Sequence, residues 1–301
     1  MIKYCLKRLA LAVLTMLIII AVTFFAMNAI PGGPFDSDKA PTPEVMAVLN
    51  QRYNLDRPLG EQFLIYLRNL LHGDFGISIK TGREISKTIF ESFRVSAAIG
   101  LEAVCFALFF GLLFGCIAAR FANRWPDRII IFLSSLAVSV PSFIIASILM
   151  LVFCLKLKWV PTWSPGSFSI LPVLALAIFP MSNITRFTKT SMLDVMGQNY
   201  IRTARASGIP EWKVMVKHAF RNAAIPVITY VGPMIAGVLS GSFVIETVFT
   251  VGGLGSQFVT AITNRDYTLI MGITVFLAAI IIGISLLSDI LYKLVDPRIK
   301  F

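Results

Sequence analysis

The stretch YIRTARASGIPEWKVMVKHAFRN, residues 200–222, is polar and basic and lies between two long apolar segments. Gly208 and Pro210 divide it. A glycine just past one helix and a proline in the first turn of the next are the usual signals for one helix to stop and another to start. We therefore expect two short helices joined by a tight elbow on one face of a membrane. A few residues would suffice to connect two spans, so a structured basic elbow indicates a docking surface for another protein.

The composition of the chain predicts an all-α integral membrane protein. Hydrophobic residues make up 56% of its 301 residues and charged residues 14%, well below the quarter or so that is usual in soluble domains. A helix that spans a bilayer needs roughly 20 mostly apolar residues. The third candidate span contains Pro141, so we expect a short amphipathic helix over 128–140 that leads into a kinked span. Six transmembrane helices are predicted, over residues 9–30, 95–119, 129–157, 170–187, 223–248 and 268–291.

The distribution of charge predicts the orientation of these spans. With the N-terminus in the cytoplasm, that side holds 16 of the 27 Lys and Arg residues and four of the 16 acids. Short basic loops weigh heavily in membrane orientation, whereas a long balanced loop such as 31–94 weighs little. Both termini and residues 200–222 are therefore expected to be cytoplasmic, and 31–94 extracytoplasmic. Orientation accounts for the net charge of +11, and no interleaving of basic and aromatic residues points to a nucleic-acid partner.

The sequence lacks the motifs of the common catalytic sites. It has no phosphate-binding loop, no H-E-x-x-H zinc motif and no G-x-S-x-G nucleophile motif. The four cysteines show neither a disulfide framework nor a metal-ligand spacing. His72 and His218 are interpreted as surface helix residues. We therefore expect no catalytic residue, no metal site and no cofactor on this chain.

Three acids, Glu102, Glu246 and Asp289, fall within or at the ends of predicted spans. Carriers driven by an ion gradient usually have such charges on their coupling path. All three lie close enough to a span end to be rim residues or hydrogen-bond partners between helices, which is the interpretation that we favour. A secondary carrier of small solutes stays open as an alternative.

Small residues recur every four positions in two predicted spans, a pattern that lets helix backbones approach closely. The second span has this stripe at Ala103, Ala107, Gly111, Gly115 and Ala119. The fifth span repeats it at Gly232, Ala236 and Ser240. The stripes predict a compact bundle, but they leave open whether the partner helix belongs to this chain or to a second subunit.

The helix after Pro210 is predicted to be amphipathic. Its basic side holds Lys213, Lys217 and Arg221. Such a helix suits either an anionic lipid surface or a groove in a cytoplasmic protein, and the residues alone leave the two readings even. Its apolar side is expected to hold Trp212, Met215, Val216, Ala219 and Phe220.

Residues 200–222 resemble the loop that carries the EAA motif in membrane subunits of ABC importers. Over nearly its whole length the chain resembles the B-type permease subunit of the oligopeptide/dipeptide (Opp/Dpp) import family. It departs from the general motif where Arg202 replaces the acid, followed by Thr203 and Ala204, as is usual in the peptide subfamily. The matching motifs are IPGGP (30–34), YNLDRPL (53–59), HGDFGIS (72–78), VPSF (140–143), YIRTARASG (200–208), HAFRNA (218–223), ETVF (246–249), NRDY (264–267) and VDPR (295–298).

The resemblance implies a division of the chain. Residues 95–301 would form the type I importer (MetI-like) core, built from helices two to six. Residues 1–94 would form the first span and an extracytoplasmic loop with weak helical patterns at 42–52, 60–72 and 83–93. That loop is large enough for a lid or docking ledge. The protein would be a multi-pass component of the bacterial inner membrane.

The resemblance also implies partners. A second, homologous permease subunit would complete the translocation path, an extracytoplasmic binding protein would deliver peptide, and two cytoplasmic ATPase subunits would bind ATP and Mg²⁺. Relatives that import nickel chelates, glutathione or sugars make those cargoes an alternative. The elbow would be the coupling helix, with ATPase-docking residues Tyr200, Thr203, Ala204, Arg205, Ala206, Gly208, Pro210, Trp212, Lys213, Lys217 and Phe220.

Overall fold

The computed structural model describes residues 2–30, 56–163, 170–239 and 241–295, and for 2–5 and 290–295 the backbone only. Over these residues the chain consists of helices and turns, with one isolated bridge between Ile77 and Glu84. Five helical segments are long and apolar enough to cross a membrane, or six if a sharply bent pair counts as one span.

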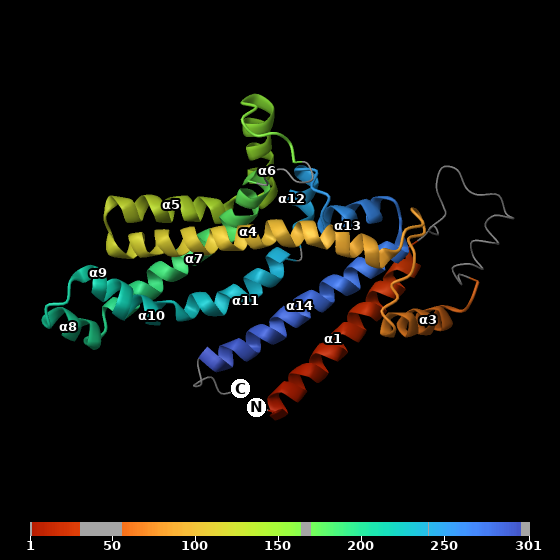
Figure 1. Cartoon of the computed structure of the whole chain (residues 1–301), viewed down its shortest axis with the longest axis horizontal. Coiled ribbons are helices and arrows are strands. Elements are labelled where there is room, and N and C mark those ends of the chain that lie inside the picture. The colour runs from red at the N-terminus through yellow and green to blue at the C-terminus, as the bar shows by residue number, and fades with distance from the viewer. Residues whose placement is uncertain (1, 31–55, 164–169, 240, 296–301) are drawn as a thin grey trace.

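The elements keep the labels of Figure 1. They are α1 Ile2–Ala29, α3 Leu59–Leu71, α4 Ile85–Arg120, α5 Trp125–Ser139, α6 Ser142–Leu149, η1 Met150–Lys156, α7 Ile170–Met196, α8 Asn199–Ala206, α9 Glu211–Lys213, η2 Val214–Ala219, α10 Phe220–Ala223, α11 Ile225–Leu239, α12 Phe243–Val248, α13 Leu254–Thr263 and α14 Tyr267–Val295.

The α4 helix lies along α7, and its stripe of small residues faces that helix. A Cβ added to Gly111 would lie 2.7 Å from Cγ2 of Ile184, and one added to Gly115 would collide with Thr188. Only glycine permits this approach, so the partner of this stripe is a helix of the same chain. Its other members, Ala103, Ala107 and Ala119, are buried as well.

The second stripe lies on α11, which packs against α4, α7 and α14. Ala236 is buried and Gly232 is half-buried, whereas Ser240 lies outside the described residues. The expected fifth span, 223–248, corresponds to the apolar segment Ile225–Val248, which is long enough to cross a membrane. Within it, α11 ends at Leu239 and α12 begins at Phe243.

The third expected span is broken far more sharply than a kink. The axes of α5 and the α6–η1 segment differ by 103°, and Figure 1 shows α6 projecting away from the other long helices. The break falls at Val140 and Pro141, because a residue before proline is forced out of the helical region. Val140 accordingly has φ −89° and ψ 127°. The short amphipathic helix expected over 128–140 is α5, a separate helix of 15 residues that packs on α4 and α7.

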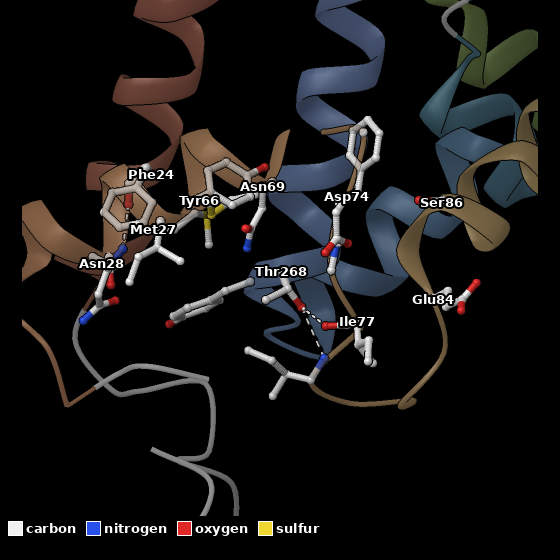
Figure 2. A pocket seen from close by; sticks show the side chains of 18 residues that line it. Phe24, Met27, Asn28, Tyr66, Asn69, Asp74, Ile77, Glu84, Ser86 and Thr268 are labelled. Atoms are coloured by element: carbon white, nitrogen blue, oxygen red, sulfur yellow. Dashed lines mark hydrogen bonds between the residues drawn. The ribbon is translucent and has the colours of Figure 1, made fainter. Parts of the chain in front are cut away.

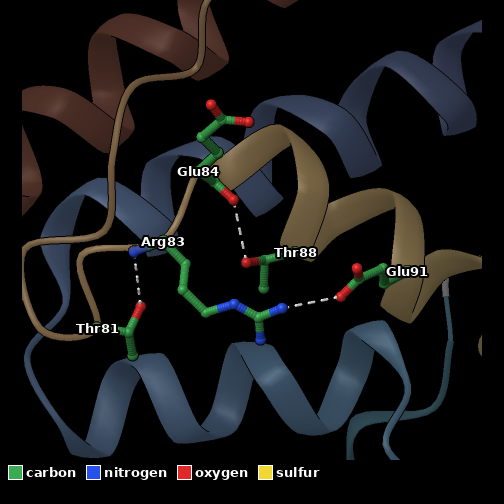
Figure 3. Close-up of polar contacts among 5 residues, drawn as sticks. All are labelled: Thr81, Arg83, Glu84, Thr88 and Glu91. Atoms are coloured by element: carbon green, nitrogen blue, oxygen red, sulfur yellow. Dashed lines mark hydrogen bonds and ion pairs between the residues drawn. The ribbon is translucent and has the colours of Figure 1, made fainter.

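The α4 helix has 36 residues and begins at Ile85, inside the loop that was expected to reach residue 94. Figure 3 shows the polar contacts at its start. Thr88 Oγ1 donates to the carbonyl of Glu84 at 3.1 Å, and Arg83 pairs with Glu91 at 3.1 Å. The expected boundary between 94 and 95 therefore falls inside one continuous helix.

Other helix boundaries differ less between the prediction and the structure. The α3 helix occupies the expected pattern at 60–72, and α7 continues past residue 187 to Met196. The pattern at 42–52 and the motifs at 30–34 and 295–298 lie wholly or mainly outside the described residues.

The motifs HGDFGIS (72–78) and NRDY (264–267) are about 190 positions apart in the sequence. They meet where the 72–84 loop contacts the start of α14. Ser78 Oγ donates to the buried Asp266 carboxylate, which also accepts from the backbone N–H of Leu269 at 3.2 Å. Thr268 Oγ1 donates to the carbonyl of Ile77 at 3.0 Å. Figure 2 shows this contact at the edge of a cavity of about 680 Å³ between α1, α3, the loop and α14.

Candidate docking elbow

The elbow, residues 199–223, begins with α8 and turns at Gly208. Gly208 has φ +73°, a conformation that residues with a Cβ rarely adopt, and it follows the end of α8 as glycine commonly does. Pro210 then stands immediately before α9 with φ −62° and ψ 141°. Gly208 and Pro210, from which the turn was predicted, thus have the backbone conformations that form it.

The inner side of the elbow is an apolar core shared with the long helices. Ile201, Val214 and Ala219 are fully buried against Met192 of α7 and Ala119 of α4. The elbow is therefore packed on the ends of two helices of the bundle.

The predicted apolar face of the second helix is wrong in part. Val214 and Ala219 form the buried face, whereas Trp212 and Val216 are each 64% exposed. The cause is the π-helical segment η2, in which the bonded positions are five residues apart. Val214 and Ala219 are five apart and lie on one side, which the 3.6-residue period of an α-helix does not predict.

The outer surface carries most of the predicted docking residues. Lys213 Nζ lies 5.4 Å from the centroid of the Trp212 ring, so a cation and an exposed aromatic ring adjoin. Ala204 is buried in the elbow's own core and Phe220 packs against it, so these two face inward. The exposed members are Tyr200, Thr203, Arg205, Ala206, Gly208, Pro210, Trp212, Lys213 and Lys217.

Two side-chain contacts that sequence reasoning missed close the elbow. Arg205 binds both carboxylate oxygens of Glu211, at 2.7 and 3.1 Å. The Arg205 guanidinium holds the pKa of the Glu211 carboxyl below its usual value. Asn222 Nδ2 donates to the Tyr200 hydroxyl at 2.8 Å and joins the two ends of the segment. The contact between Arg205 and Glu211 could have been predicted, because their opposite charges flank the Gly-Ile-Pro turn. Nothing in the neighbouring sequence predicts the contact between Asn222 and Tyr200.

The three acids of the spans have different surroundings. Glu102 is exposed. Asp289 pairs with Arg8 at 2.9 Å and links α14 to α1. Glu246 is buried and accepts hydrogen bonds from Ser96 Oγ at 2.8 Å and from the backbone of the α13 start. Two of the three are thus partners between helices.

Within the part of the chain that the structure describes, no group of three or more His, Cys, Asp or Glu side chains could hold a metal ion. The exposed side of the elbow instead places the aromatic ring of Trp212 beside the basic side chain of Lys213.

The long apolar helices around a common core are those of a multi-pass membrane protein. Two family models match the chain. The model described as "Binding-protein-dependent transport system inner membrane component" matches residues 111–301. The model described as "Binding-prot-dependent transport system membrane comp, N-term" matches residues 1–100.

Curated proteins match along the whole chain. The oligopeptide transport system permease protein OppB of Haemophilus influenzae is 41% identical over 306 residues, covering 100% of both chains. The dipeptide transport system permease protein DppB of Bacillus subtilis is 42% identical over 303 residues, covering 100% of this chain and 98% of that one. OppB of Escherichia coli is 38% identical over 306 residues, again covering both chains fully.

The chain therefore belongs to the family of inner membrane components of binding-protein-dependent transport systems. The resemblance to the Opp/Dpp permeases of ABC importers is confirmed. Members of this family are permease subunits, which are not themselves catalytic.

Proposed function

We propose that this chain is a permease subunit of an ATP-driven importer and forms part of the membrane path for peptides. An extracytoplasmic binding protein delivers the peptide, and partner ATPase subunits bind ATP and Mg²⁺ and hydrolyse the nucleotide. The names of the relatives support the cargo, because they state oligopeptide or dipeptide transport. A second, homologous permease completes the path. Nickel chelates, glutathione and sugars are the alternative cargoes.

The proposed topology has six spans, with α5 and the α6–η1 segment counted as one. Both termini and the elbow are cytoplasmic, and α3 with the 72–84 loop is extracytoplasmic. The excess of Lys and Arg on the side of the elbow supports this orientation. In Figure 1 the elbow and α3 lie at opposite ends of the molecule, and α1 and α14 run antiparallel side by side, joined by Arg8 and Asp289.

The elbow is the observation that carries the proposal. Its inner face is packed on α4 and α7, and its outer face presents Trp212 and Val216 beside Lys213 and Lys217. Large exposed apolar anchors with a basic rim are typical of a helix that fills a groove in a partner. The partner is an ATPase subunit, and its closure on ATP moves the elbow and, through Val214 and Ala219, the two long helices.

Ion-coupled transport is the alternative class. Two of the three acids that favoured it are held by fixed partners, Asp289 by Arg8 and Glu246 by Ser96 and the α13 backbone. Such contacts are those of structural side chains.

The test is peptide uptake into proteoliposomes that hold both permeases, the ATPases and the binding protein. We expect uptake of a labelled tripeptide that requires ATP inside and persists when ionophores collapse the ion gradients. Uptake that proceeds without ATP and stops with the ionophores would establish the carrier instead. Competition by a nickel chelate, glutathione or a sugar in place of peptide would reassign the cargo.

A further inference from the structure

A cavity of about 650 Å³ lies beside the breaks that follow α5 and α11 and beside a proline within α7. It is lined by the α5–α6 break at Pro141, by α7 around its internal Pro180, by α11 around Pro233, and by residues 241–245 at the start of α12. Irregular backbone at membrane depth is tolerated where it is buried in protein or lines a cavity. Transporters of other folds place their substrates at such interrupted helices.

The wall of this cavity is uncharged. Among the described residues that line it, none is acidic or basic. The side-chain polar groups there are the hydroxyls of Ser142, Ser242 and Tyr230. The Tyr230 hydroxyl accepts a hydrogen bond from Asn183 Nδ2 at 3.2 Å, so its own proton can be donated to a ligand.

One residue of this wall has a backbone carbonyl that lacks its usual helical donor. Pro180 has no N–H, so it cannot bond to the carbonyl of Leu176, four residues earlier in α7. Leu176 itself lines the cavity. A carbonyl deprived of its helical donor at membrane depth favours a ligand that carries N–H groups.

We infer that this cavity holds the peptide on its way through the membrane and binds it through its main chain. The inference rests on the proposed function and assigns a place to its cargo. A peptide main chain offers N–H and C=O groups at every residue, and the hydroxyl groups of the wall and the Leu176 carbonyl can pair with such groups. A lipid tail would make no use of them. The volume lies within the roughly 300–1,000 Å³ that is typical of small-ligand sites.

An uncharged wall has a consequence for specificity. A charged wall would attract peptides of one sign and repel those of the other. Contacts to the main chain are common to all peptides, so the cavity accepts side chains of either charge. Any selection among peptides by their charge is therefore made elsewhere in the transport system and not by this wall.

One wall is held in place by a buried carboxylate. Glu246 in α12 accepts from Ser96 in α4 and from Gly255 and Ser256 in α13. The preceding residue, Ile245, lines the cavity. The α12 wall is thus tied to two other helices.

Gly237 gives the sharpest test of the cavity. It lines the cavity, and a Cβ added there would meet no atom within 4 Å, so a larger side chain would enter open space. Gly283 on α14 is the matched control. It is also exposed and also has nothing within 4 Å of an added Cβ, but it does not line the cavity.

The experiment measures ATP-driven uptake of trialanine by the reconstituted complex. We expect uptake to fall in the order Gly237→Ala, Gly237→Leu, Gly237→Trp, with the last near background. Gly283→Trp keeps wild-type uptake. Recovery of the ATPases and the second permease with each variant shows that the complex has assembled. Wild-type uptake by an assembled Gly237→Trp complex would overturn the inference, and the cavity would then be a lipid-filled space.

A charge variant provides a second, independent measurement. The wild-type complex should take up Ala-Lys-Ala and Ala-Glu-Ala at similar rates when both are loaded on the binding protein to the same extent. Gly237→Asp should shift the ratio about tenfold towards the lysine peptide, because opposite charges attract across a partly desolvated site. An unchanged ratio would contradict the assignment. If the wild-type complex takes up no peptide at all, that result contradicts the proposed function, peptide import. It does not test whether the cavity is the binding site.

Discussion

Lys189 Nζ lies 2.6 Å from Oδ1 of Asp127, and this ion pair joins α7 to the first turn of α5. The side chains are 21% and 5% exposed, so the pair is largely removed from water. The second carboxylate oxygen of Asp127 accepts the backbone N–H of Asn123 at 2.8 Å. Met192, almost one helical turn after Lys189, belongs to the apolar core of the elbow. The pair therefore fixes the end of the bundle on which the elbow is seated.

Removing one member of this pair should destabilise the chain more than removing both. Lys189→Met leaves a buried carboxylate without its partner, which typically costs about 3–5 kcal/mol. Lys189→Met combined with Asp127→Asn should recover most of that loss. The measurement is the thermal unfolding midpoint of the purified subunit pair in detergent. A double variant that is no more stable than Lys189→Met would show that the pair does not act as a unit.

The turn at Gly208 should tolerate asparagine better than valine. Its φ of +73° costs a β-branched residue about 1–3 kcal/mol, whereas asparagine visits this region more readily. We expect Gly208→Val to retain ATP hydrolysis and lose peptide uptake in the assembled complex, because the α9–η2 segment is reoriented. Gly60→Val, at an exposed glycine without positive φ, is the control. Normal uptake by Gly208→Val would argue against a role for the elbow in coupling.

The orientation predicts which positions an impermeant thiol reagent reaches in whole cells. On a background without the native cysteines, Lys80→Cys should be labelled and Lys213→Cys spared. Both positions are exposed, so accessibility in the folded chain does not differ between them. Labelling of Lys213→Cys with protection of Lys80→Cys would reverse the topology.

The contact between Arg205 and Glu211 predicts a weak pH dependence of the elbow. Because the pKa of Glu211 is lowered in the folded chain, the stabilisation is present above the pKa of the unfolded glutamate and is lost as pH falls through the lower folded value. Both groups are more than a third exposed, so the contribution is limited to about 0.2–1 kcal/mol. Hydrogen exchange of residues 205–211 should speed up relative to α3 at low pH, and Glu211→Gln should abolish that change. An equal acid response in Glu211→Gln would assign the effect to another group.

Local features of the elbow were predictable because they depend on neighbouring residues. Gly208 and Pro210 specify a turn by their own backbone preferences, whatever surrounds them. The buried face of the second helix was not predictable, because η2 shifts the spacing from three or four residues to five. The glycines of α4 predicted close packing, but only the three-dimensional structure identifies α7 as their partner.

Contacts between distant segments account for most of what the sequence left open. Ser78 and Asp266 are 188 positions apart, and Ser96 and Glu246 are 150 apart. No periodicity or spacing relates such residues, because the fold alone brings them together. The sharp bend at Pro141 likewise exceeds what a proline implies, since proline ends a helix without fixing the direction of the next one.

The central claim is that the elbow docks in a protein groove, and pull-down of the ATPases from detergent-solubilised complexes tests it most directly. Trp212→Ala combined with Val216→Ala should release the ATPase subunits while the two permeases stay together, because the exposed anchors are lost. Leu64→Ala on α3, at a side chain that is also 64% exposed, should leave recovery unchanged. Lys213→Ala combined with Lys217→Ala should weaken recovery less. Full recovery of ATPase without Trp212 and Val216 would contradict the account and favour a helix that rests on anionic lipid.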